Sequence, residues 1–368
     1  LSLTETWKKY YEIEFKEKLK TKNNYSLNDN SQSLVGKYIQ SATERRLECD
    51  VPVQIALSGG IDSALIANFS SKSKNVIRAI NVSFDSNLDE SSRAEHIANK
   101  FELNFKKIKF DISQFENELK QAIIINNAPL AHPHYLAVLM LCKEAQKLGK
   151  VLLTGEGADE LFFGYNHYEN FSGSFAFREY LTYEEENLFI DKKNLSELPF
   201  SKIRFDSNIK NLRKVALHSA ANSRDLEIKT HLLSLLRRND RMSMAHSVEI
   251  RSPFLDHNLY RYVLNNISSK ELIANRKDSL KNLFNQINPG MLTFDKKIGF
   301  TIPFDENFHK IMVGSNSKIW LSKALNFLEE NLDLKIKDDK KVTPRLGWSL
   351  LNIGCFLDSM KNNVYIKK

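Results

Sequence analysis

The sequence lacks any apolar run approaching the roughly 20 residues that span a bilayer. Its opening residues, LSLTETWKKY, contain no apolar core followed by a small-residue cleavage site, which a secretory signal requires. We therefore expect no membrane partner and a cytoplasmic location. The cysteines, Cys49, Cys142 and Cys355, are odd in number and form no C-x-x-C pair. They predict neither a disulfide framework nor a thiolate zinc site.

Arginine-rich arms and aromatic-interleaved RNA motifs are also absent, although the net charge is +8. Acidic residues lie among the lysines, as in residues 335–340 (KIKDDK), so the charge is typical of a solvated surface. Long-range attraction of ATP is another role for such a charge. We predict no nucleic-acid partner. A chain of 368 residues, 42% hydrophobic and 27% charged, is typical of one large or two ordinary globular domains, and two are expected.

A short apolar run at residues 53–57 ends at a Ser-Gly-Gly turn and predicts a buried parallel strand. Further strand patterns alternate with helical ones and lie at Val76–Phe84, Phe105–Phe110 and Val151–Leu153. Strands separated by helices predict an α/β fold, in which a twisted parallel sheet carries helices on both faces. Helices are expected at residues 36–47, 89–101, 112–123, 134–148, 231–241 and 278–286.

The pattern divides the chain into three parts. Residues 1–50 are expected to form a helical segment that packs on the core, with residues 36–47 against the sheet. Residues 51–170 are expected to form the α/β core. Residues 171–368 show long helical patterns with little strand-like alternation, so we predict a mostly α-helical C-terminal half in close contact with the core.

The loop at residues 58–63, Ser-Gly-Gly-Ile-Asp-Ser, lies between the first strand and a helix. Gly59 and Gly60 let the backbone turn tightly and approach an anion, and the helix N-terminus presents unpaired N–H groups. Ser58 and Ser63 add hydroxyl donors, whereas Asp62 would repel a phosphate unless a cation such as Mg²⁺ lies between them. The alternative is a plain strand–turn–helix with a capping residue. The loop is neither a Walker P-loop nor a dinucleotide fingerprint.

A second acidic segment, residues 155–165, follows the fourth strand. It places the carboxylates Glu156, Asp159 and Glu160 at the C-terminal edge of the sheet, where doubly wound folds bind ligands. A surface helix start rich in acidic residues is the alternative. The flanking glycines disfavour it because they suit a close approach of backbone to ligand.

Together these segments resemble the synthetase domain of the asparagine synthetase family. The resemblance extends from about residue 33 to about residue 304, and the motifs that carry it are residues 58–63, 84–94, 155–165, 240–256 and 296–300. It implies the ATP pyrophosphatase fold, which is adenine nucleotide alpha hydrolase-like, and ATP and Mg²⁺ as cofactors.

The resemblance also implies roles for single residues. Asp62 and Asp159 would hold Mg²⁺, Glu156 takes the place of the catalytic glutamate, and Lys297 would stabilise charge developing on the phosphates. Ser58, Gly60 and Ser63 would bind pyrophosphate, and the backbone near Leu57, Val82 and Ser83 would receive the adenine. The implied ATP site comprises Leu57, Ser58, Gly59, Gly60, Asp62, Ser63, Val82, Ser83 and Gly155.

The implied reaction is amide formation in two steps. A small-molecule carboxylate attacks the α-phosphorus of ATP to give an acyl-adenylate and pyrophosphate. Ammonia or an amine then displaces AMP.

Two departures from the family bear on the substrates. Full-length family members carry an N-terminal glutaminase with a nucleophilic terminal Cys, whereas here about 50 residues precede the loop strand and the sequence starts at Leu1. We expect a separate glutaminase partner, an amine that does not come from glutamine, or a truncated sequence. The second departure is the run Asn126-Asn127-Ala128-Pro129, where the family usually has Asp-Glu before the proline. It leaves the acyl acceptor open.

Other readings stay open. A biosynthetic relative would act on a sugar acid, a β-amino acid or a peptide, as a lasso-type cyclase does. Glu156 lies where β-lactam-forming relatives are expected to carry Tyr, which opposes a β-lactam-forming enzyme. A lasso-type peptide cyclase stays open. A catalytically inactive nucleotide-binding module is opposed by the set Asp62, Glu156, Asp159 and Lys297.

Residues 240–256 are expected to be mainly scaffold, with Met242, Met244 and Phe254 in the core and Glu249 paired with Arg251 in a buried ion pair. A charged residue there that contacts substrate is the alternative.

His132 and His134 flank Pro133 before a helix. Because no acidic or Cys partner lies at ligand spacing, they are read as polar loop residues rather than metal ligands.

Overall fold

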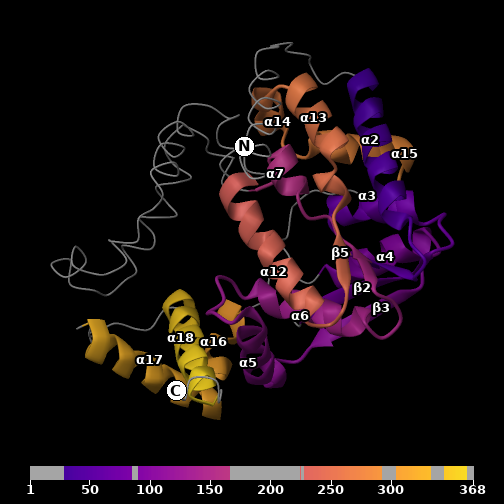
Figure 1. The fold of residues 1–368 in the computed structure, drawn as a ribbon. Helices are drawn as coiled ribbons and strands as arrows, with labels where there is room; N and C mark the ends of the chain where they lie inside the picture. Colours follow the sequence, from indigo (N-terminus) through magenta and orange to yellow (C-terminus); the bar gives the residue numbers. More distant parts are fainter. Residues whose placement is uncertain are drawn as a thin grey trace, which may run out of the picture.

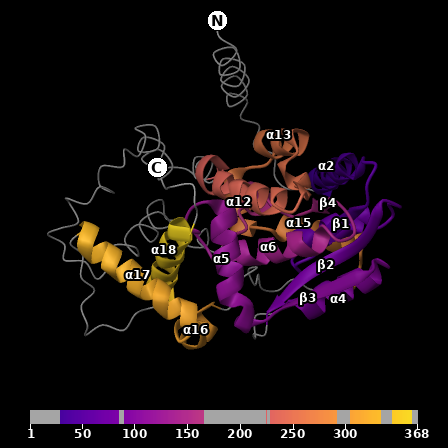
Figure 2. The same cartoon turned by 60° about the horizontal axis from the view of Figure 1, so that its bottom comes forward.

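The computed structural model describes residues 29–84, 90–165, 224, 228–291, 304–332 and 344–362. Its centre is a parallel sheet with the strand order β3-β2-β1-β4-β5 (Figures 1 and 2). The strands are β1 Val53–Ala56, β2 Val76–Phe84, β3 Phe105–Phe110, β4 Val151–Leu153 and β5 Glu249–Arg251. The predicted α/β class and the first four strands are confirmed. The fifth strand was not predicted, because its sequence, Glu-Ile-Arg, holds a single apolar residue.

The helices of the first half lie near their predicted ranges, although α2 begins at Asp29 rather than at residue 36 and the short α7 was not among the predicted helices. They are α2 Asp29–Leu47, α3 Ile61–Ser70, α4 Ser91–Lys100, α5 Phe115–Asn126, α6 His134–Ala145 and the short α7 Ala158–Phe162, with a 3₁₀ turn, η1, at Ile112–Gln114. Of the four apolar residues at helical spacing here, Ala94, Ile97 and Ala98 of α4 are fully buried, whereas Phe101, just after the helix, is half-buried against the same core.

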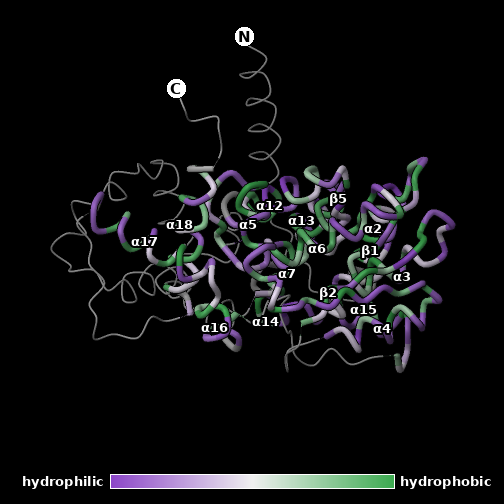
Figure 3. The backbone as a smooth tube through the Cα atoms, turned by 90° about the horizontal axis from the view of Figure 1, so that it is seen from below, coloured by the Kyte–Doolittle hydropathy of each residue, from purple (hydrophilic) through white to green (hydrophobic). Residues whose placement is uncertain are grey.

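Alternate residues of the strands enter two separate cores. Val53 and Ile55 of β1 pack with α2, α3, α4 and α15 on one face. Ile80 of β2 and Leu152 of β4 pack with α5, α6 and α12 on the other. Since successive strand side chains point to opposite faces, the sheet is covered on both sides, as predicted. Hydrophobic residues gather inside, around β1 and α6 (Figure 3).

The described part of the C-terminal half is mostly helical, as predicted. Its elements are the π-helical turn η4 Ile228–Leu232, α12 Leu233–Met244, the 3₁₀ turn η5 Pro253–Leu255, α13 His257–Asn266, α14 Ser269–Asn275, α15 Asp278–Ile287, α16 Phe304–Met312, α17 Ser315–Leu332 and α18 Pro344–Asn362. Helices α16 to α18 form a group beside α5, away from β1 to β3 (Figures 1 and 2). Gly354 of α18 lies so close to Trp320 of α17 that a Cβ would be 1.8 Å from the Trp320 carbonyl oxygen. None of the described helices is long and apolar enough to cross a membrane.

Two expectations for residues 240–256 were wrong. Met244 is 51% exposed, whereas Met242 and Phe254 are fully buried. Glu249 and Arg251 do form an ion pair, with 2.9 Å between Oε1 and Nε, but the Glu249 side chain is 59% exposed. Both residues belong to the edge strand β5, which places Glu249 toward solvent. Arg251 instead joins two segments by donating to the carbonyl of Arg46, at 2.8 Å.

Helix α2 packs against α3 and α13, and its residues Val35, Ile39 and Leu47 share the core of β1. Its last turn is held by Asp256, whose Oδ2 accepts from Arg45 Nη2 at 2.7 Å and from Arg46 Nη1 at 2.5 Å. Asp256 also caps α13 through Oδ1, which accepts from the amides of Asn258 and Leu259. One buried carboxylate therefore fixes the N-terminal helix to the C-terminal half.

Asp256 predicts a pH-dependent loss of stability. Burial would raise the pKa of this carboxyl, but the hydrogen bonds from Arg45 and Arg46 outweigh it and lower the pKa from 3.8 to about 2. Because the folded-state pKa is depressed, the stabilisation is present above about pH 4 and is lost as pH falls toward 2. Asp256→Asn keeps the cap but removes the charge, so we expect its unfolding free energy at pH 6 to be about 1–2 kcal/mol lower. Urea titrations at pH 6, 4 and 3 should show the gap closing; a constant gap would contradict the assignment.

Candidate functional site

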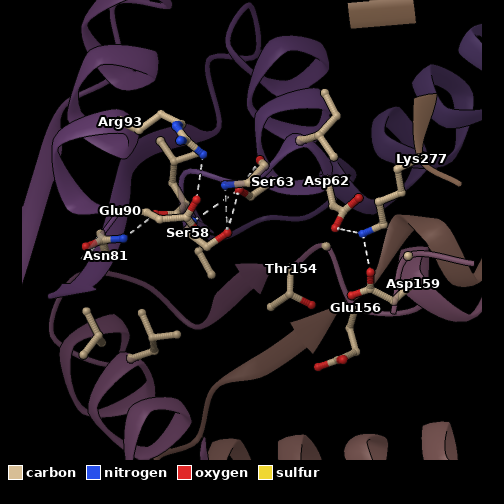
Figure 4. Close-up of a pocket in the computed structure, with 18 of the residues that line it drawn as sticks. Ser58, Asp62, Ser63, Asn81, Glu90, Arg93, Thr154, Glu156, Asp159 and Lys277 are labelled. Carbon is tan, nitrogen blue, oxygen red and sulfur yellow. Dashed lines mark hydrogen bonds and ion pairs between the residues drawn. The ribbon is translucent and has the colours of Figure 1, made fainter. Parts of the chain in front are cut away.

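A cavity of about 700 Å³ opens at the carboxyl ends of β1, β2 and β4 (Figure 4). From β1 the chain proceeds to β2 and β3 on one side, and then returns to β4 on the other side of β1. The order of strands therefore reverses between β1 and β4, and open α/β sheets bind ligands at such a switch point. The wall includes residues 56–58 and 60–63 at and after the end of β1, residues 154–156 and 159 after β4, and residues 274–278 and 281 where α14 ends and α15 begins.

The loop after β1 leads directly into α3 and is held by its own hydroxyls. Ser58 Oγ and Ser63 Oγ lie 3.0 Å apart, and the Ser58 amide donates to Ser63 Oγ at 3.2 Å. The N-cap of α3, Gly60, has no side chain to satisfy the first amides. The helix N-terminus therefore presents N–H groups and the positive end of its dipole to the cavity.

Glycine is suited to the two positions of this loop for different reasons. Gly59 has φ +93°, and a Cβ there would lie 2.8 Å from the Glu90 carbonyl oxygen, so the fold itself requires glycine. Gly60 has φ −78° and ψ 163°, which any residue can adopt. Apart from its chain neighbours, the only described atom within 4 Å of a Cβ at Gly60 would be Ser58 Oγ, at 3.4 Å. A side chain at Gly60 would point into the cavity.

The end of β2 forms the apolar side of the cavity. Val82 and Ile80 line it together with Val138 of α6, whereas Ser83 and Gly59 do not. The Leu57 amide already donates to the Ile80 carbonyl at 2.8 Å, and the Leu57 carbonyl accepts from Asn81 Nδ2 at 2.8 Å. Since a carbonyl has two lone pairs, Leu57 can accept one further hydrogen bond but cannot donate another.

Asp62 and Asp159 face the same cation. This cation is a lysine ammonium, whose presence between them the sequence did not predict. The ammonium of Lys277, the residue before α15, lies between the two carboxylates and bonds to Asp62 Oδ2 and, at 2.5 Å, to Asp159 Oδ1 (Figure 4). The Lys277 side chain is only 6% exposed. Burial lowers the pKa of Lys277, but Asp62 and Asp159 outweigh it, and the pKa is raised. Lys277 therefore stays charged.

These carboxylates fit a divalent cation. They converge on one cation position from loops at the ends of two neighbouring strands, and carboxylate oxygens are the ligands that Mg²⁺ prefers. No group of three or more His, Cys, Asp and Glu residues that could hold a metal occurs within the described ranges. Mg²⁺ in nucleotide sites commonly uses one or two carboxylates and takes its other ligands from phosphates and water.

Glu156 points away from this ion-pair group (Figure 4). Its Oε2 accepts from Arg238 Nη2 at 2.8 Å and from Asn239 Nδ2 at 2.9 Å, both on α12.

Glu160, the third carboxylate of the segment, does not line the cavity. It is fully buried and accepts a hydrogen bond from Tyr165 at 2.5 Å, and burial raises its pKa to about 7. Two of the three predicted carboxylates thus reach the site.

Several other predicted positions lie elsewhere. Lys297 is outside the described residues. None of residues 126–129 lines the cavity, and Asn127 instead ends α5 in the left-handed conformation, with φ +51°. His134 begins α6, and its ring is tilted by 36° against that of His132, with 4.0 Å between the ring centroids. Its Nε2 has no hydrogen-bond partner among the described residues. Burial and nearby His132 and Arg238 hold the pKa of His134 well below its usual value.

Comparison with known proteins identifies the family of the chain. A family model described as asparagine synthase matches residues 34–336. The chain belongs to the asparagine synthase family. The glutamine-hydrolysing asparagine synthetase 3 of Bacillus subtilis (strain 168) is 27% identical over 297 residues, which are 73% of this chain and 48% of that protein. Asparagine synthetase 1 of the same organism is 24% identical over 370 residues, or 85% and 57%.

The chain thus spans about half the length of these curated relatives. Among solved structures, the NH3-dependent NAD synthetase of Campylobacter jejuni matches 72% of this chain and 99% of its own, at 17% identity and a TM-score of 0.28.

Gly60 and Gly164 give a matched prediction. Gly60→Ala should leave the melting temperature unchanged within about 1 °C and weaken ATP binding at least tenfold, about 1.4 kcal/mol, because the methyl group enters the cavity. Gly164→Ala should instead lower the unfolding free energy by about 1–3 kcal/mol. Its Cβ would lie 2.0 Å from Asp159 Oδ1 and 2.2 Å from Lys277 Cε. Thermal unfolding and isothermal titration with ATP measure both effects; a destabilised Gly60→Ala would contradict the assignment of this glycine to ligand.

Proposed function

We propose that this chain is an ATP-dependent amide-forming ligase that adenylates a carboxylate and then transfers ammonia or an amine to it. The observation that carries the proposal is the pairing of the loop after β1 with Asp159 across one cavity. Hydroxyls and a helix N-terminus lie on one side, and two carboxylates converge on a cation position on the other. Membership of the asparagine synthase family supports the same reaction class.

The phosphates of ATP are assigned to the β1 side. In the proposal Ser58, Gly60 and Ser63 bind the pyrophosphate portion, since the α3 N-terminus offers amide donors to an anion. The Ser63 hydroxyl donates to the Gly60 carbonyl at 3.0 Å and would turn from it toward the phosphate. Asp62 and Asp159 would hold the divalent cation, which when bound supplies charge neutralisation to the phosphate oxygens. Arg93 also lines the cavity, but its charge is already paired with Glu90 at 2.6 Å.

The adenine is assigned to the end of β2. Val82 and Ile80, with Val138 of α6, form an apolar surface for the base. The second lone pair of the Leu57 carbonyl can accept from the exocyclic amino group. Ser83 could contact the adenine only through its backbone, as the family resemblance implies. Its side chain is buried and does not line the cavity.

Glu156 is assigned to the acyl-transfer step. Arg238 and Asn239 both bond to Oε2, and in the described structure no hydrogen bond reaches Oε1. A carboxylate fixed in this way can accept a proton from an incoming ammonium or amine through Oε1. The carboxylate substrate attacks the α-phosphorus and pyrophosphate leaves; the amine then attacks the acyl carbon, AMP leaves, and the proton passes to Glu156.

The substrate class is tested by product analysis. The protein is incubated with ATP, Mg²⁺, ammonia and a panel that includes aspartate, β-amino acids, sugar acids and peptides. The expected products are AMP and pyrophosphate, formed only with an accepted carboxylate, and one ¹⁸O atom passes from a labelled carboxylate to AMP. Formation of ADP and phosphate, or carboxylate-independent AMP, would overturn the adenylation step. ATP binding without AMP from any member of the panel would favour the inactive module.

Replacement of Glu156 should separate the two steps. Glu156→Gln keeps the shape and the acceptor oxygen for Asn239 but cannot take a proton, so amide formation should fall about 100-fold or more while carboxylate-dependent pyrophosphate exchange falls less than about tenfold. Glu249→Gln, an exposed carboxylate of β5 outside the cavity, is the matched control and should change neither rate. Equal loss of both rates in Glu156→Gln would show that Glu156 serves binding or adenylation.

A further inference from the structure

The ion-pair group of Lys277, Asp62 and Asp159 is unusual because its cation comes from a buried lysine. Lysine is rarely buried unless it is paired, and here the pairing is with two carboxylates at once. The carboxylates belong to the loops after β1 and β4, whereas Lys277 lies between α14 and α15, 215 residues from Asp62. Three separate segments therefore meet at one ammonium group.

The backbone around this group is shaped to let Lys277 enter. Arg276, directly before it, has φ +34°, a region that residues other than glycine rarely adopt. Gly164 follows the left-handed residue Phe163, which ends α7 with φ +53°. A Cβ at Gly164 would overlap both Asp159 and Lys277. The fold thus tolerates strain at Arg276 and a missing side chain at Gly164 in order to place this ammonium.

Lys277 and a divalent cation cannot hold this position together. Mg²⁺ binds carboxylate oxygens at about 2.0–2.1 Å, and the ammonium is already in direct contact with one oxygen of each carboxylate. Two cations at one point would repel strongly in a partly buried site. The charges agree with an exchange: two carboxylates and one ammonium leave a net charge of −1, whereas a divalent ion balances the carboxylates and releases the ammonium.

We propose that Lys277 occupies the cation position between Asp62 and Asp159 while nucleotide is absent, and that its ammonium moves to the phosphates when ATP and its divalent cation bind. The inference rests on the proposed function, because Mg·ATP supplies both the replacing cation and the new anionic partner. Lys277 lines the cavity and has a flexible four-carbon stem, so the movement needs no change of fold. As a positioning residue it keeps the two carboxylates together and prevents them from binding free metal.

The test is Mn²⁺ binding without nucleotide, measured from the electron paramagnetic resonance signal of free Mn²⁺. Wild-type protein should bind Mn²⁺ weakly, and Lys277→Met should bind it at least tenfold more tightly. In EDTA the melting temperature of Lys277→Met should be lower than that of wild type, and Mn²⁺ should raise it; wild type should show no such rise. Lys277→Gln is measured in parallel, so that a folding failure of the Met variant leaves the test intact.

Lys281→Met is the matched control. Lys281 lies one turn later on α15 and lines the same cavity, but it pairs with Asp278 at 3.0 Å. This variant should keep the wild-type Mn²⁺ affinity. Tight binding of Mn²⁺ by nucleotide-free wild type, or no gain in the foldable Lys277 variants, would overturn the proposal.

A further arm separates this inference from the proposed function. Wild type is titrated with Mn²⁺ in the presence of α,β-methylene-ATP, which should raise the Mn²⁺ affinity at least tenfold as Lys277 is displaced. If the Lys277 variants gain Mn²⁺ and the analogue binds wild type, measured by calorimetry, without raising its Mn²⁺ affinity, the exchange is rejected while the ATP site stands. If the analogue does not bind at all, the proposed function fails while the cation position of Lys277 stands.

Discussion

The parallel pairing of β1 with β4 is the constraint on which the site depends. It aligns Val53 with Val151 and Ile55 with Leu153, so the two strands end side by side. Their loops then approach so closely that a Cβ at Gly155 would lie 2.9 Å from the Cβ of Asp62. Because the chain reverses direction across the sheet at this pair, both loops open toward the same side of one crevice. The two carboxylates meet for that reason.

The sequence was sufficient to predict the first four strands and the loops at the edge of the sheet, because each of them has a recognisable local pattern. Val76–Phe84 and Phe105–Phe110 were predicted with their observed bounds, since β-branched and aromatic residues recur there between turn residues. Strand β5 has no such signal: it is three residues long and forms only by pairing with β4. The placement of Glu160 in the core was also hidden, because its partner Tyr165 was read as part of the motif rather than as a hydrogen-bond donor.

The residues that sequence reasoning missed are cations. Lys277 lies in the run Asn-Arg-Lys-Asp-Ser, which reads as a solvated surface segment, and Arg238 lies on an amphipathic helix where arginine is ordinary. Their functional character comes from burial against Asp62, Asp159 and Glu156, which are distant in sequence. Acidic residues at strand ends can be identified from topology alone. Their counterions can come from any helix that the tertiary fold brings near, so only the structure identifies them.

Asp62, Asp159 and Glu156 fall into two classes by their partners. Asp62 and Asp159 share an ammonium on a flexible stem, whereas Glu156 is held by a guanidinium and an amide of one rigid helix. A lysine ammonium is a point charge that can exchange for another cation, while a planar guanidinium bonds with fixed directions. The first class is therefore suited to a position whose cation changes during a reaction cycle. The second suits a group that must keep its orientation while a proton moves.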